Sequence, residues 1–427
     1  MLEASIVDEN VALTRGYNMA FGVMSEQIYQ IMNIEVFDTL LKNSVPKGKE
    51  SDDAETRKFA IKSLSSAIKR WGPQNLSPDT LKRSVETFYQ GMNDYQIDRR
   101  GDVGSWVREE SMLALNDFIQ LIQLQEYQAL REALGATHHE FYARFISALL
   151  QQLCEKIDKV REVAGRTLQE FFKKVAIPHG VLAGMESADQ LAALFTSSDH
   201  QGGFGVPVEK VVSEAVGYLP WRNAEFVFTS IRPFFDSNVF SISIFKGLIT
   251  SSGGLTESTL KASSNSLFEY LSSMKEASHK KIFLGKLIKI FELNLKDERV
   301  TVPLMKTIEM LLASDYLTEQ TEVLLDELNQ IHAVTVQECS KSKNIVKLMS
   351  SAGVFAAMLV QTDKALITKC VKSLLFLLYH AFPRVRKLTA EKLYTALLTM
   401  EDATIILPEE EYEQVVEMLS ETNWDGV

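Results

Sequence analysis

A motif that returns along the chain with a constant internal spacing constrains the fold more than any other feature. In its best copy, Arg108 follows Val107, and the apolar residues Leu115, Phe118 and Ile119 stand 8, 11 and 12 positions after that valine. These offsets place the apolar residues on one face of an α-helix, by its 3.6-residue period. The motif therefore predicts an amphipathic helix with an arginine in its first turn.

Other copies of the motif start at Val160 and Val385, a copy without the valine starts at Thr56, and a copy without the arginine starts at Val300. The steps between successive copies are 51, 53, 140 and 85 residues. We interpret the first two as one repeat each with a longer loop, the last as about two repeats, and the step of 140 as containing repeats too degenerate to recognise. Two helices in a period of roughly 40–47 residues are typical of HEAT and armadillo repeats. We therefore expect an all-α, HEAT/armadillo-like solenoid of stacked helix pairs with a continuous core.

Charged residues accompany the motif and predict a ladder between neighbouring repeats. An acid at a helix start caps free backbone N–H groups and suits the positive end of the helix dipole. An arginine one turn later can hydrogen-bond that acid or a carbonyl of the next repeat. We assign this structural role, rather than partner contact, to Asp102, Trp106, Arg108, Asp158, Arg161 and Arg386.

Composition supports an ordered helical protein and excludes some classes of binding partner. With 46% apolar residues, 10 prolines and 21 glycines in 427 residues, helices are favoured over a turn-rich β architecture. The net charge of −11 argues against nucleic acid or an anionic membrane as the main partner. The most apolar run, residues 374–382, is far shorter than the roughly 20 residues that span a bilayer. Three widely spaced cysteines, Cys154, Cys339 and Cys370, indicate free thiols in a reducing cytosol.

We expect HEAT-like repeats over residues 1–175, a degenerate helical region with a loop insertion over 176–255, and C-terminal HEAT-like repeats over 256–427. The insertion is either a partner-binding loop or a linker. Among individual elements, we expect a helix over 137–156 opened by a capping box of Thr137 and Glu140, one helix over 320–348, and no strand.

No set of residues indicates catalysis. His138 and His139 are adjacent, so on a helix they point to different sides and cannot share a ligand face. The glycine-rich segment 202–205 lacks the Lys-Ser/Thr of a phosphate loop. We therefore predict no catalytic, cofactor-binding or metal-binding residues, and a protein-binding scaffold rather than an enzyme.

Several stretches outside the repeat motif carry a family resemblance. They are NVALTRG (10–16), RGDVGSWVRE (100–109), GGLTEST (253–259), SLFEYL (266–271), DERVTVPLMKT (297–307), FPRVRKLTAEKLY (382–394) and SETNWD (420–425). In this order and spacing they resemble the C-terminal part of the tubulin-folding cofactor D family, and they span nearly the whole chain. The family's proteins are far longer, with a large N-terminal solenoid.

The resemblance implies a cytoplasmic, microtubule-associated chaperone. Family members capture β-tubulin, and with tubulin-folding cofactors E and C they assemble or take apart the α/β-tubulin heterodimer. Stimulation of tubulin's GTPase is then a property of the complex, and an Arf-like small GTPase regulates the family. The implied chain needs no cofactor and inserts into no membrane.

We expect partner contacts on exposed positions of the helices at 104–124, 158–175 and 384–399 and in the loops 93–103 and 197–207. Arg99 and Arg100 are the candidate contact residues. Two alternatives stay open. The chain could be a HEAT scaffold or adaptor unrelated to tubulin, of the transport or phosphatase type, or it could hold a catalytic or nucleotide-binding domain within 176–255.

Overall fold

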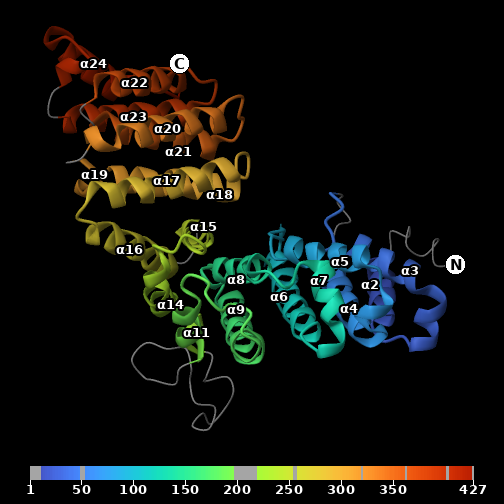
Figure 1. Ribbon diagram of the computed structural model, residues 1–427. Coiled ribbons are helices and arrows are strands. Elements are labelled where there is room, and N and C mark those ends of the chain that lie inside the picture. Colours follow the sequence, from blue (N-terminus) through green and yellow to red (C-terminus); the bar gives the residue numbers. More distant parts are fainter. Residues whose placement is uncertain are drawn as a thin grey trace. The chain divides into compact units, whose positions relative to one another are not determined.

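The computed structural model describes residues 11–48, 53–196, 219–252, 257–318, 321–360, 363–400 and 403–425. Within these ranges the regular structure is almost entirely helical, so the all-α prediction is confirmed (Figure 1). The chain divides into two compact units, Met1–Ile244 (unit 1) and Phe245–Val427 (unit 2). The boundaries expected at residues 175 and 255 stay predictions. None of the helices in the described ranges combines the length and the apolar character that crossing a membrane requires.

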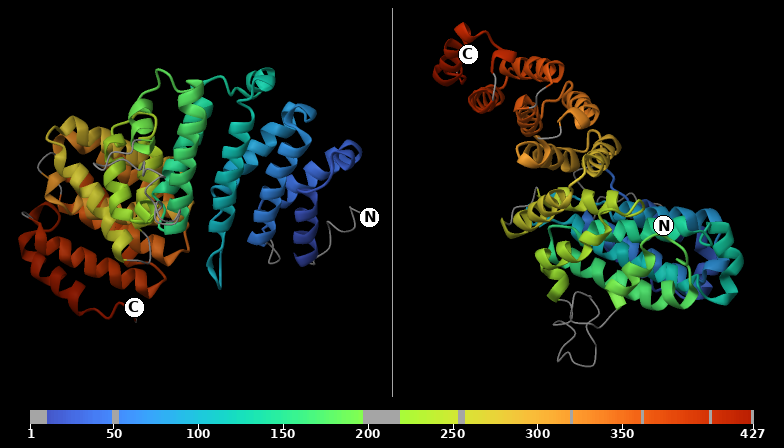
Figure 2. Two further views of the ribbon diagram at one scale, coloured as in Figure 1. Left: turned by 90° about the horizontal axis from the view of Figure 1, so that it is seen from below. Right: turned by 60° about the vertical axis from the view of Figure 1, so that its left-hand side comes forward.

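Unit 1 stacks helices in two rows. The second helix of each pair, in the order α2 (Val11–Phe21), α4 (Ala54–Trp71), α6 (Gly104–Leu121) and α9 (Asp158–Phe171), packs against the next. The first helices α3 (Glu26–Asn43), α5 (Pro78–Gly91) and α8 (His139–Leu153) pack on α4, α6 and α9, and α7 (Gln128–Leu134) packs on α5. Figure 2 shows these blue-to-green helices side by side. We call the row of second helices the ladder row.

Unit 2 repeats the arrangement. Its pairs are α17 (Ala277–Leu293) with α18 (Glu298–Leu312), α20 (Thr321–Cys339) with α21 (Ile345–Ala357), and α22 (Lys364–Leu378) with α23 (Pro383–Thr399). Helices α18, α21 and α23 form its ladder row, and α24 (Glu409–Glu421) packs on α23. Both units are therefore solenoid segments of stacked helix pairs, as the repeat motif predicts.

The remaining elements are short or stand between the pairs. They are the 3₁₀ turns Pro73–Asn75, Gln125–Tyr127, Arg232–Phe234, Met358–Val360 and Ala403–Ile405, the π-helical turn Phe172–Ala176, and the helices α10 (Ile177–His179), α11 (Ala188–Thr196), α13 (Leu219–Arg222), α14 (Ala224–Ile231), α15 (Ser241–Ser252), α16 (Glu257–Ser273) and α19 (Asp315–Thr318).

The repeat motif explains why the ladder-row helices pack. In α6, Val107, Leu115, Phe118 and Ile119 are all buried, at the offsets that the sequence gives for one helical face. Full burial of such side chains contributes about 1.5–3 kcal/mol each. Several helix starts are fixed by a side chain that accepts a backbone N–H. These N-caps are Asp53, Ser77, Asn223, Asp297, Asn344 and Asp363.

Three expectations about individual elements were wrong. The residue before α8 is His138, which makes no side-chain cap, so Thr137 and Glu140 form no capping box. The helix expected over 320–348 ends at Cys339, where Lys341 takes a positive φ of 59°, and Asn344 caps a new helix. Two short antiparallel strands, β1 (Ile97–Asp98) and β2 (Gly101–Asp102), form a small hairpin before α6.

Candidate protein-binding surfaces and the ladder beneath them

Two ladder arginines of unit 1, Arg57 and Arg108, converge on the loop between α5 and α6. Arg57 of α4 is buried, and its Nε lies 2.6 Å from the Asp94 carboxylate while its Nη2 donates to Gln96. Arg108 of α6 donates to the backbone carbonyl of the same Asp94 at 2.6 Å. Gly104 has no room for a Cβ beside that carbonyl, so a glycine is required where α6 starts. One aspartate thus joins two successive repeats.

Arg108 also binds the β1–β2 hairpin through Asp102. Both of its terminal nitrogens lie 3.1 Å from the Asp102 carboxylate, and its guanidinium stacks 4.0 Å from the Tyr95 ring centroid. Glu155, before α9, lies 3.9 Å away. Burial alone would lower the pKa of Arg108, but Glu155, Tyr95 and Asp102 more than offset it and hold the pKa above its ordinary value. The buried cation therefore stays charged.

Arg161, unlike Arg57 and Arg108, donates its hydrogen bonds to backbone carbonyls and not to a carboxylate. Its guanidinium donates to the carbonyls of Glu155 and Lys156 at 2.7 and 3.0 Å, and to those of Trp221 and Arg222 after α11. Asp158 instead accepts the N–H of Lys159, and Ile157 is the N-cap residue of α9. Burial lowers the pKa of Arg161, and the opposing effects of Asp158, Cys154 and Glu155 do not fully offset it.

Arg386 of unit 2 is bound in the same way as Arg161. It donates to the carbonyls of His380 and Ala381 before α23 and to the carbonyl of Trp424 after α24. Trp424 in turn donates its indole N–H to the carbonyl of Leu419. The expected residue Trp106 is half-buried at the start of α6, outside this network.

Two further contacts that join a ladder-row helix to the next repeat were not predicted from the sequence. We call such contacts rungs. Arg15 of α2 binds Asp53 with two nitrogens at 2.8 Å. In unit 2, Glu338 is fully buried and pairs with Lys347 at 2.6 Å, and it accepts the Thr301 hydroxyl. The number of residues between the two partners of each contact is the signal that could have revealed both of them.

That separation is nearly constant across four rungs. Arg15 and Asp53, and Arg386 and Trp424, stand 38 residues apart, and Arg57 and Asp94 stand 37 apart. Thr301 and Glu338 are also 37 residues apart, although no arginine takes part. Each rung therefore joins the first turn of a ladder-row helix to the residues one repeat later.

The candidate contact residues Arg99 and Arg100 lie at the tip of the β1–β2 hairpin, and both are exposed. Arg100 binds Asp98 at 2.7 Å and Glu55 at 3.0 Å, and its guanidinium lies 5.1 Å from the Trp106 ring centroid. The hairpin thus presents two cations beside a half-buried aromatic ring. The loop 197–207 lies outside the described residues.

The ladder row of unit 1 carries three carboxylates on α6, of which Glu109 and Glu110 are half-buried and Asp117 is exposed. Burial raises the pKa values of Glu109 and Glu110, against the opposing effect of lysines on the neighbouring helices.

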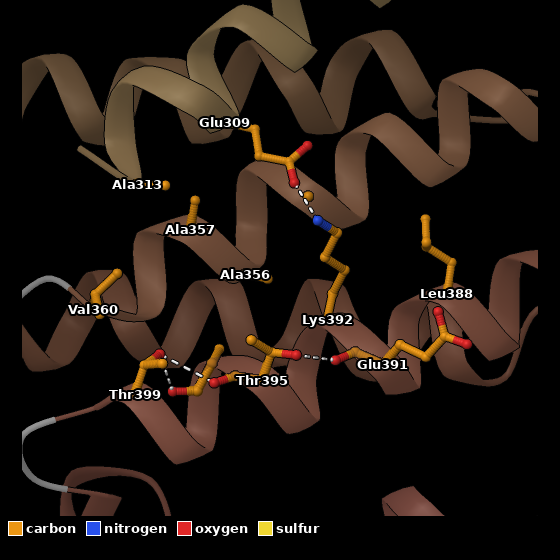
Figure 3. Close-up of a pocket in the computed structure, with 12 residues that line it drawn as sticks. Glu309, Ala313, Ala356, Ala357, Val360, Leu388, Glu391, Lys392, Thr395 and Thr399 are labelled. Carbon is orange, nitrogen blue, oxygen red and sulfur yellow. Dashed lines mark hydrogen bonds and ion pairs between the residues drawn. The ribbon is translucent and has the colours of Figure 1, made fainter.

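The ladder row of unit 2 is hollowed into a groove of about 620 Å³ (Figure 3). Its floor consists of small residues of α21, and α18 and α23 form its walls. The lining residues are Glu309, Ala313, Gly353, Ala356, Ala357, Val360, Leu388, Glu391, Lys392, Thr395, Ala396 and Thr399. Because the floor lacks large side chains, the groove can admit side chains of a partner.

An ion pair crosses this groove. Glu309 of α18 lies 2.5 Å from Lys392 of α23, and Figure 3 shows the two side chains pointing toward each other. The Glu309 carboxylate occupies the space that a Cβ on Gly353 would fill. The groove therefore combines an apolar floor with a charged pair that is 23% and 40% exposed, a pattern suited to a protein partner.

Within the described ranges, no three His, Cys, Asp or Glu side chains gather in a way that could hold a metal ion. All three cysteines are free thiols, and burial raises the pKa of each.

Comparison with known proteins shows which proteins this chain is similar to. Residues 143–347 match the family described as tubulin folding cofactor D C terminal. Tubulin-specific chaperone D of Dictyostelium discoideum is 25% identical over 394 residues, which cover 86% of this chain and 24% of that protein. The chain thus spans about a quarter of the length of this curated relative.

A solved structure, that of an engineered protein, aligns over 93% of this chain and 99% of its own at 16% identity, with a TM-score of 0.29 that is too low to indicate a shared fold. The family and the relative agree with the resemblance carried by the separate stretches of sequence. Residues 143–347 are thus similar to the C-terminal family of tubulin folding cofactor D, and the chain is similar to tubulin-specific chaperone D over most of its length.

Proposed function

We propose that this chain acts as the C-terminal part of a cytoplasmic tubulin-folding chaperone rather than as an enzyme. The observation that carries the proposal is the match of residues 143–347 to the cofactor D family, together with similarity to a tubulin-specific chaperone over 86% of the chain. In this role the chain binds β-tubulin and takes part in assembling or separating the α/β heterodimer.

The finer partners follow from the same resemblance. Tubulin-folding cofactors E and C join the complex, an Arf-like small GTPase regulates it, and GTPase stimulation arises only in the assembly. Association with microtubules follows from tubulin binding. The residues Asp102, Trp106, Arg108, Asp158, Arg161 and Arg386 have structural roles, and partner contacts fall on the ladder rows and the hairpin.

The structure supports a binding role through its surfaces. The carboxylates of Glu109, Glu110 and Asp117 lie on α6, and a groove with an apolar floor lies on α18, α21 and α23. Both lie on ladder rows, the faces on which solenoids commonly bind partners. An unrelated HEAT scaffold would offer similar faces, so the tubulin assignment depends on the family match.

Size-exclusion chromatography of the purified chain with α/β-tubulin, with and without the small GTPase, tests the proposal. We expect co-elution, or recovery of β-tubulin separated from α-tubulin. A folded, monodisperse chain that co-elutes with neither protein would contradict tubulin binding by this part of the family.

Reversing the charges of Arg99 and Arg100 should weaken tubulin binding about tenfold, a change of about 1.4 kcal/mol. Both side chains are exposed, and exposed ion pairs such as Arg100–Asp98 contribute little to stability, so the thermal midpoint should stay unchanged. Arg83→Glu, at an exposed position of α5, serves as the matched control. If the double variant bound tubulin with wild-type affinity, the hairpin would not be part of the interface.

Thr395→Trp should fill the unit 2 groove and reduce tubulin affinity about tenfold or more, because an indole in a groove of about 620 Å³ leaves little room for a partner. Thr395 is exposed, so the fold should tolerate the substitution. Glu413→Trp on α24 adds the same exposed ring outside the groove and should bind as wild type. Equal binding of the two variants would exclude the groove as a contact.

A further inference from the structure

Helix α22 has two apolar faces, and only one of them packs. Leu366, Ile367, Cys370, Leu374 and Leu377 are buried against the neighbouring helices. On the opposite side, Leu375, Phe376 and Tyr379 are 53%, 82% and 93% exposed. These three residues belong to the most apolar run of the chain, yet their side chains are not part of the core of unit 2.

The three exposed residues form one patch. On a helix, residues three and four positions apart are neighbours, so Leu375, Phe376 and Tyr379 share a face. We call them the α22 patch. Exposed aromatic side chains of this size are the usual anchors of protein interfaces, because their burial releases much apolar surface at small entropic cost.

Positive charge surrounds the α22 patch. Lys369 and Lys372 precede Phe376 by seven and four residues, which places them on the same face, and both are exposed. Arg384 and Lys387, at the start of α23, are exposed as well. Residues 364–390 contain six Lys and Arg and no Asp or Glu, in a chain whose net charge is −11.

The local charge identifies the class of partner. We propose that the α22 patch binds an acidic amphipathic segment of a partner protein, with apolar side chains on Phe376 and Tyr379 and carboxylates toward Lys369 and Lys372. A nucleic acid or an anionic membrane would meet repulsion from the strongly acidic remainder of the chain. A short acidic segment meets only the basic region.

This interface is distinct from the groove proposed for tubulin. The patch lies on α22, the first helix of its pair, whereas the groove is lined by the ladder row α18, α21 and α23. The two proposals therefore predict separable variants, and the test of the patch uses no tubulin.

Fluorescence anisotropy on the whole chain tests the proposal with three labelled helical peptides of about 18 residues, or five turns. The first carries Leu and Phe on one face and Glu on the other, the second replaces Glu by Lys, and the third replaces Leu and Phe by Ser. We expect the first to bind at least about ten times more tightly than either of the others, and its affinity to fall with added salt.

Phe376→Ser with Tyr379→Ser should weaken binding of the acidic peptide about tenfold or more, and so should Lys369→Glu with Lys372→Glu. Leu293→Ser removes another exposed apolar residue of unit 2 and should bind as wild type. Equal affinity for the acidic and basic peptides, or wild-type binding by the Phe376 and Tyr379 variant, would overturn the proposal. Binding to phosphatidylserine vesicles that the acidic peptide fails to displace would overturn it in favour of a membrane.

Discussion

Arg108→Met should lower the free energy of unfolding by roughly 3–5 kcal/mol, the usual cost of removing one partner from a buried ion pair. The side chain of Arg108 is fully buried, and its removal takes a donor from the Asp102 carboxylate and the Asp94 carbonyl and a nearby positive charge from Glu155. Methionine fills a similar volume, so the loss reports charge and hydrogen bonding rather than a cavity.

Urea denaturation followed by circular dichroism measures this change, with Arg83→Met as the matched control. Arg83 pairs with Asp38 at 2.9 Å, but both side chains are about half exposed, so its loss should cost no more than about 1 kcal/mol. If Arg108→Met were as stable as Arg83→Met, the ladder would contribute nothing to stability and partner contact would become its better explanation.

Lys347→Met should destabilise unit 2 by a similar roughly 3–5 kcal/mol. Lys347 and Glu338 are 3% and 0% exposed and lie 2.6 Å apart, so the substitution leaves a buried carboxylate without its cation. The Lys347 ammonium contacts Glu298 as well, at 3.2 Å. Lys306→Met, at an exposed position of α18, should change stability by less than about 0.5 kcal/mol.

A second substitution separates charge from packing at this site. Adding Glu338→Gln to Lys347→Met removes both charges, and the glutamine oxygen can still accept the hydrogen bonds from Thr301 or the N–H of Lys296. We expect the double variant to recover at least about half of the lost stability, because no buried charge remains. A double variant no more stable than Lys347→Met would mean that lost packing, not the unpaired carboxylate, causes the effect.

The repeat motif was sufficient to predict helix stacking and the positions of the buried arginines, because periodic apolar residues and an early arginine are local signals. The partners of those arginines were harder to predict. Arg161 and Arg386 bind backbone carbonyls, which every residue carries and which leave no mark in a sequence. The pair Lys347–Glu338 was missed because its cation comes from α21, where the motif is absent.

The groove and the break between α20 and α21 show a second limit of prediction from sequence. Gly353, Ala356 and Ala357 match an ordinary buried helix face, and only the stacking of three helices turns them into the floor of a groove. The break between α20 and α21 did leave a signal in the sequence, namely the polar run 340–343 followed by Asn344, a favoured N-cap residue, but the prediction of a single helix overlooked it. Neighbouring helices, rather than local pattern, decide both features.

The rung made by Arg161 has a consequence for how far along the chain one side chain can hold the stacked helices together. It ties the start of α9 to carbonyls 60 and 61 residues later, whereas four other rungs span 37 or 38 residues. Both ends of the longer span meet at one buried guanidinium. Loss of this single side chain would therefore remove both ends of the tie at once, while the contacts of Arg57 and Arg108 would stay intact.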